Sequence, residues 1–169
     1  MFQIRPASKE EIPLVLTFIR ELARYERLEH EVTATEEDLR EALFGARPYA
    51  EVVFACLEGS PVGFALYFHN FSTFKGRPGI YLEDLYVLPE ARGRGIGKRL
   101  LEHLAAAALE RRCSRLEWAV LEWNDPSICF YRSLGAVPLD DWRIFRLTGE
   151  ALEQLGAARP RDPTVGPSR

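Results

Sequence analysis

Three glycines at alternate positions are the feature of this sequence that most directly indicates chemistry. Gly93, Gly95 and Gly97 lie between a run of β-branched, aromatic and aliphatic residues at 80–88 and a stretch where apolar residues recur at helical spacing. The first amides of a helix have no acceptor within the helix and lie at the positive end of its dipole, so they attract an anion. Because glycine has no Cβ, a phosphate can approach such a backbone closely. The sequence therefore predicts a phosphate-binding turn between a strand and a helix.

The spacing of this turn separates it from two other phosphate-binding motifs. A P-loop requires glycine and Ser or Thr where this chain has Arg92 and Arg99, and the dinucleotide fingerprint requires a third glycine where it has Lys98. The pattern Arg-x-x-Gly-x-Gly instead resembles the pyrophosphate loop of the GNAT N-acetyltransferases, which bind acetyl-CoA. The alternative is a plain glycine corner between a strand and a helix. A plain corner does not need alternating glycines, nor the nearby cations Arg92, Arg94, Lys98 and Arg99.

The order of the predicted elements indicates an α/β fold with a mixed central β-sheet flanked by helices. Strands are predicted at 2–6, 50–58, 61–70, 80–88, 116–121 and 142–147. Helices are predicted from the capping box of Ser8 to about Tyr25, from Thr35 to near Gly45, over 95–111, and from an Asp125 N-cap to Gly135. Residues 1–155 are expected to form a single domain, and residues 156–169, which hold little to bury, a disordered tail.

Composition argues against several classes of function. The chain has 169 residues and a net charge of −3, whereas nucleic-acid binders usually present a basic face. Its apolar runs are too short to span a membrane. Its three histidines are isolated, which gives no metal-ligand spacing, and neither a disulfide pattern nor a signal peptide is evident. We expect a cytoplasmic protein without a metal, a nucleic-acid partner or a membrane partner.

Further along the chain, a series of segments resembles the diamine acetyltransferases, a GNAT branch with spermidine/spermine and thialysine enzymes. The segments are Tyr25-Glu26, 81–84, 92–97, 122–127 and Phe130-Tyr131. The resemblance implies the GNAT fold, direct transfer of acetyl from acetyl-CoA to a small-molecule amine such as a diamine, polyamine or thialysine-like amino acid, and a homodimer. Residues 71–77 lack an acid that the polyamine enzyme carries, and Glu117 and Trp118 also differ. Residues 71–77 look more like the thialysine-preferring branch, and both departures argue against spermidine itself as the substrate.

The resemblance also assigns residues to each part of the site. The acyl and pantetheine arm would meet the strand end at Leu85, Tyr86 and Val87. The pyrophosphate would meet the turn formed by Arg92, Gly93, Arg94, Gly95, Ile96, Gly97 and Lys98. A second cofactor contact maps to Asn124, Asp125, Pro126, Ser127 and Tyr131. The amine would be contacted by Tyr25, Glu26, Glu83, Glu117, Trp118 and Ala119.

Two residues are the predicted catalytic groups. The resemblance makes Tyr131 the general acid, and a phenol with a pKa of about 10 is protonated at pH 7 and can donate to a departing thiolate. Strand alternation predicts that Glu83 shares a face with Leu85 and Val87, opposite Asp84. Because a carboxylate on an apolar face is costly, Glu83 is expected to have a role, namely to bind the cationic amine while water carries its proton.

Several alternatives remain open at this level. Tyr131 and Trp118 could be core aromatics, Glu83 could form an ordinary salt bridge, and Tyr25 with Glu26 could be a solvated helix end. A peptide or protein N-acetyltransferase would prefer peptides to small amines. A non-catalytic CoA-binding module would bind the cofactor without releasing thiol.

Overall fold

The apolar runs of the sequence form a mixed sheet in the order β1-β2-β3-β4-β5. The computed structural model describes residues 1–158. Its strands are β1 (Phe2–Pro6), β2 (Glu51–Leu57), β3 (Ser60–Ser72), β4 (Arg77–Val87) and β5 (Leu116–Trp118). The first four strands pair antiparallel, whereas β5 pairs parallel with β4. The predicted mixed sheet is confirmed, although β5 ends three residues before the predicted position 121.

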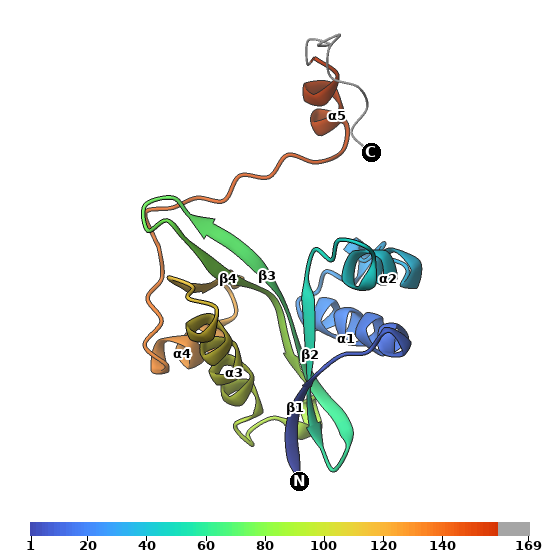
Figure 1. Cartoon of the computed structure of the whole chain (residues 1–169), viewed down its shortest axis with the longest axis vertical. Coiled ribbons are helices and arrows are strands. Elements are labelled where there is room, and N and C mark those ends of the chain that lie inside the picture. The colour runs from blue at the N-terminus through green and yellow to red at the C-terminus, as the bar shows by residue number, and fades with distance from the viewer. Residues whose placement is uncertain (159–169) are drawn as a thin grey trace. The chain divides into compact units, whose positions relative to one another are not determined.

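Helices cover both faces of this sheet. Helices α1 (Ile12–Tyr25) and α2 (Glu36–Phe44) lie on one face, and α3 (Ile96–Glu110) lies on the other (Figure 1). On the α1 face, the Phe18 ring lies 5.7 Å from that of Phe54 and 5.3 Å from that of Phe64, and all three side chains are buried. Helix α3 packs on β3, β4 and β5. The core on both faces holds the end of β4 and the start of α3 in place.

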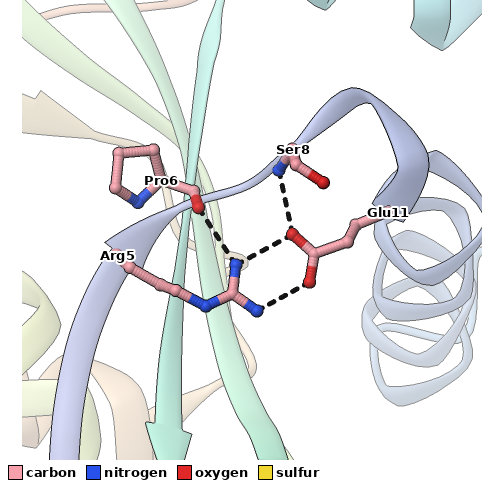
Figure 2. A network of polar contacts seen from close by, with 4 residues as sticks. All are labelled: Arg5, Pro6, Ser8 and Glu11. Carbon is pink, nitrogen blue, oxygen red and sulfur yellow. Dashed lines mark hydrogen bonds and ion pairs between the residues drawn. The ribbon is translucent and has the colours of Figure 1, made fainter. Parts of the chain in front are cut away.

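The predicted capping box at Ser8 joins β1 to α1. The amide of Ser8 donates to Glu11 Oε2 at 2.9 Å, and the Arg5 guanidinium contacts both carboxylate oxygens of Glu11 at 2.8 and 2.6 Å (Figure 2). Arg5 also donates to the carbonyl of Pro6. Hydrogen bonding to Arg5 lowers the pKa of Glu11 to about 2, so this link stays charged at physiological pH. The entry angle of α1, and hence the position of its C-terminal end, is set by these contacts.

The residues after Asn124 form a second compact unit, which contains α4 (Asp125–Ser133) and α5 (Gly149–Ala157). Helix α4 begins at Asp125 itself, one residue before the predicted first helical position. It ends before Gly135, whose φ is +88°. Helix α5 was not predicted from the sequence, and it includes the first two residues of the expected tail. Residues 159–169 of that tail lie outside the described residues, and the single domain expected over 1–155 stays a prediction.

The strand predicted at 142–147 is wrong. These residues are not in a strand, and their large apolar side chains are exposed, with Trp142 at 75% and Phe145 at 91%. A strand is stable only when a neighbouring strand takes its backbone hydrogen bonds. The sequence pattern reports apolar content but cannot report whether such a neighbour is present.

Candidate active site

The predicted phosphate turn connects the end of β4 to the first residue of α3. Gly93 and Gly95 have left-handed backbones, with φ of +74° and +75°, a conformation that residues with a Cβ rarely adopt. Apart from the two residues adjacent in the chain, a Cβ built on either glycine would meet no atom of the described residues within 4 Å. The backbone of the turn is therefore open to close approach by a ligand, as a phosphate site requires.

The first turn of α3 supplies the donors. Its first helical hydrogen bond runs from the amide of Arg99 to the carbonyl of Gly95, at 3.1 Å. The amides of Ile96, Gly97 and Lys98 precede this bond and have no acceptor within the helix. The Ile96 side chain is buried and anchors the turn in the core. The residues present thus fit the pyrophosphate of a coenzyme, because adjacent amides and the helix dipole both favour an anion.

The four cations near the turn differ in what their side chains contact. Arg99 lies over the ring of Phe2 at 4.6 Å, and Arg92 stacks on two tyrosine rings. Lys98 is 3.7 Å from Glu102, and Arg94 is exposed. We therefore expect the positive charge nearest a bound phosphate to come from Arg94 and Lys98, and the turn to rely mainly on its backbone.

Strand β4 carries an irregularity where the acids Glu83 and Asp84 lie. Asp84 pairs with Leu66 and Leu82 pairs with Tyr67, so Glu83 is an extra residue without a partner in the ladder. Such a bulge interrupts the regular alternation of side chains. The expectation that Glu83 lies on an apolar face is wrong, because Glu83 is exposed.

Asp84 is the carboxylate that this bulge places in a low-dielectric environment. Burial raises the pKa of Asp84 to about 7, and the negative charges of Glu83 and Glu26 raise it further. Glu26 lies at the C-terminal end of α1, and burial raises its pKa as well. The charges of Glu83 and Glu26 therefore act on Asp84 a few residues before the phosphate turn, which is an arrangement that suits a cationic group.

Sequence reasoning noticed the acid pair but emphasised Glu83 instead of Asp84. The pair itself was a usable signal, since two adjacent acids in an apolar strand are unusual. Which of the two is buried depends on the extra residue in β4 relative to β3, and a single strand's sequence does not contain that information.

Tyr25 holds the end of α1 next to the loop that follows β5. Its hydroxyl donates to Asn124 Oδ1 at 3.1 Å, and its ring lies 6.1 Å from the ring of Trp123. Asn124 is a buried polar residue, 5% exposed. The structure thus brings Tyr25 and Asn124 together, although the resemblance assigned them to different ligands.

The remaining predicted cofactor contacts belong to the second unit. Asp125, Pro126, Ser127 and Tyr131 all lie on α4. The Tyr131 ring packs 5.4 Å from that of Phe130, and its backbone carbonyl accepts from the amides of Leu134 and Ala136 at 3.0 and 3.2 Å. The assignment of these residues to the site stays a prediction.

Comparison with known families connects these features. The Acetyltransferase (GNAT) family matches residues 16–136, which is more than half of the chain. The matched region includes the glycine turn, the acid-bearing strand and α4. The chain belongs to the GNAT acetyltransferase family. Its fold and its enzyme class were therefore predicted correctly from the sequence.

Individual relatives of this GNAT acetyltransferase act on small amines. The chain is 42% identical over 163 residues to a thialysine N-epsilon-acetyltransferase of Bos taurus, covering 90% of the chain and 95% of that protein. It is 30% identical over 198 residues to an L-ornithine N5-acetyltransferase of Arabidopsis thaliana. That match covers 90% of the chain and 87% of the relative. Among solved structures, an integron cassette protein from the mobile metagenome of V. cholerae superposes with a TM-score of 0.78 at 30% identity. That superposition covers 93% of the chain and 98% of the cassette protein.

Glu117, which the resemblance assigned to the amine, already has partners in this GNAT acetyltransferase. Its Oε2 accepts from Asn70 Nδ2 at 2.7 Å and lies 2.8 Å from Arg115 Nε. Its neighbour Trp118 ends β5, and Ala119 follows as an exposed residue. The Glu117 charge is compensated within the chain, so a structural role at the β4–β5 edge is expected.

The substitution Glu117→Ala should lower stability, because it leaves a half-buried Arg115 without its carboxylate. The expected loss is about 1–2 kcal/mol in the free energy of unfolding, measured by urea titration. Glu37→Ala is the matched control, since Glu37 pairs with Arg40 on the exposed face of α2 and its loss should have a much smaller effect. Equal effects from the two variants would contradict the structural role.

Two negative findings apply to residues 1–158. No helix among them is long and apolar enough to cross a membrane. No group of three or more potential metal-ligating side chains is found among them.

Proposed function

We propose that this chain transfers the acetyl group of acetyl-CoA to a primary amine of a small molecule. The observation that carries the proposal is Asp84, a mostly buried carboxylate close to Glu83 and Glu26, on the strand that leads into the phosphate turn. When bound, acetyl-CoA supplies a thioester with a transferable acetyl group. A coenzyme held by the turn would lie next to a group of acids, which is the environment that an alkylammonium prefers.

We propose an amino-acid-like amine, such as a lysine analogue or ornithine, or a short diamine as the acceptor. The named relatives support this, because one is a thialysine and another an ornithine acetyltransferase. A second ammonium on such molecules would be attracted by the acids Glu26 and Glu83. A free α-carboxylate would need a cation, and Arg27, exposed and 5.2 Å from the Trp123 ring, lies next to Glu26 in the chain.

We further propose that Asp84 accepts the proton of the attacking amine. An aliphatic amine has a pKa of about 10.4 and must lose a proton before it can attack. A base works best when its own pKa lies near the working pH, and the pKa of Asp84 is about 7. Glu83 and Glu26 then attract the ammonium, while Tyr131 protonates the departing thiolate.

The proposal is tested by thiol release from acetyl-CoA against a panel of amines. Thialysine, lysine, ornithine, spermidine and short peptides are compared at equal concentration. Turnover with one of the small amines supports the proposal. Preference for peptides would point to a peptide or protein acetyltransferase, and CoA binding without thiol release from any amine would point to a binding module.

The substitution Tyr131→Phe is expected to lower kcat by about 10–100-fold and to leave the Kd of CoA unchanged. The effect of the lost acid is moderate, because a thiolate with a pKa of about 8.5 is a fair leaving group and water can protonate it. Steady-state kinetics and calorimetry provide the two measurements. Tyr49→Phe is a matched control, since Tyr49 is 79% exposed in the loop before β2. A kcat that matches the parent enzyme would rule out Tyr131 as the acid.

We also propose that the enzyme is a cytoplasmic homodimer. The support for the homodimer is the resemblance to the diamine acetyltransferases, and the support for the location is the three scattered cysteines, which suit a reducing compartment.

A further inference from the structure

The guanidinium of Arg92, at the start of the phosphate turn, contacts two tyrosine rings. Its Cζ lies 5.0 Å from the ring centroid of Tyr25 and 5.2 Å from that of Tyr86. Its Nε donates to the carbonyl of Val87 at 2.9 Å. The guanidinium of this exposed residue therefore contacts two aromatic rings and a strand carbonyl, all within the first compact unit.

The two tyrosines belong to different elements, Tyr86 to β4 and Tyr25 to α1. Tyr86 is buried at the end of β4, where its ring lies 6.4 Å from that of Phe18 in the core. Tyr25 is the last residue of α1 and is followed by Glu26. Arg92 thus joins the end of the cofactor strand to the end of the helix that carries an amine-side acid.

A guanidinium is better suited to this position than an ammonium. It is planar, so it can stack on aromatic rings, and its Nε–H can donate in the plane at the same time. Lysine would keep the positive charge but would lose the planar stack and the directed bond to Val87. The substitution Arg92→Lys therefore tests whether the site depends on the planar shape of the Arg92 side chain or only on its charge.

We infer that Arg92 is a positioning residue that couples the two halves of the site. By contacting both Tyr25 and Tyr86, it keeps Glu26 near Asp84, whose pKa the Glu26 charge raises. The inference rests on the proposed function, because it assigns the effect of Arg92 to amine binding. If Arg92 instead bound the coenzyme phosphate, its charge would determine the affinity for CoA, and the amine KM would not depend on it.

The test compares Arg92→Lys with the parent enzyme in amine KM at saturating acetyl-CoA and in the Kd of CoA by calorimetry. A positioning role predicts that the amine KM rises about tenfold while the Kd of CoA stays within about twofold. Arg94→Ala is the contrasting variant on the same turn, and it should weaken CoA binding and leave the amine KM unchanged. Retained CoA binding also shows that Arg92→Lys is folded, and the unchanged amine KM shows the same for Arg94→Ala.

A double-mutant cycle with Tyr25→Leu measures whether the stack is responsible. If Arg92 acts through the Tyr25 ring, the double variant should have an amine KM close to that of the worse single variant. Tyr25→Phe keeps the ring, so Arg92→Lys should raise the amine KM by the same factor in the Tyr25→Phe background as in the parent. The inference is overturned if Arg92→Lys raises the Kd of CoA but not the amine KM, or if the two effects on KM are independent. Absence of thiol release by the parent enzyme with every amine would instead overturn the proposed function, and the inference with it.

Discussion

Replacing Gly95 with glutamate is expected to reduce the affinity for CoA by at least about a hundredfold, a loss near 3 kcal/mol. Two effects act in the same direction. Gly95 has a φ of +75°, where a side chain strains the backbone. The open space beside its Cα, which a phosphate would occupy, would also receive a negative charge. Calorimetry with CoA measures the change directly.

The matched control is Gly59→Glu. Gly59 lies in the β2–β3 turn with a φ of +85° and the same open surroundings, so the variant has the same strain and the same added charge. It should lose stability without losing CoA affinity. Unchanged CoA binding in Gly95→Glu, or an equal loss in both variants, would refute the phosphate site.

The substitution Asp84→Asn is expected to lower kcat/KM by about 10³-fold at pH 7.5 and to raise stability at the same pH. The kinetic loss follows from removal of the proposed proton acceptor for an amine of high pKa. The gain in stability follows because asparagine cannot acquire the charge that burial disfavours. A loss of activity with a gain in stability distinguishes a functional acid from a structural one.

The sign of the pH dependence follows from the raised pKa. Asp84 keeps its proton up to about pH 7 in the folded state but only to about pH 4 when unfolded. Its contribution to stability is therefore greatest below pH 4, declines as the pH rises from 4 to 7, and is constant above that. The free energy of unfolding of Asp84→Asn should exceed that of the parent by about 3 kcal/mol at pH 8 and should equal it near pH 4.

Urea titrations at pH 4 and pH 8 measure this difference, and Glu83→Gln is the matched control. Glu83 is exposed, so its neutralisation should change the unfolding free energy far less than Asp84→Asn does. A stability difference between Asp84→Asn and the parent that does not vary with pH would show that Asp84 has an ordinary pKa. The proton acceptor would then have to be sought elsewhere.

The sequence alone determined the glycine turn between β4 and α3, the fold class and the enzyme family. These depend on contiguous residues, because a strand, a glycine turn and an amphipathic helix are each specified by local conformational preferences. Gly93 and Gly95 adopt the left-handed conformation that glycine tolerates best, and the capping box predicted at Ser8 forms.

The tertiary structure decided the features that depend on pairing between distant segments. The bulge at Glu83 exists only relative to β3, and it determines that Asp84 is the buried acid. The apolar residues at 142–147 form no strand because a strand requires a neighbour. Arg92 looked like a phosphate ligand in the sequence, yet its guanidinium contacts Tyr25 from α1 and Tyr86 from β4. Local sequence specifies backbone conformation, whereas side-chain environment is set by residues far away in the chain.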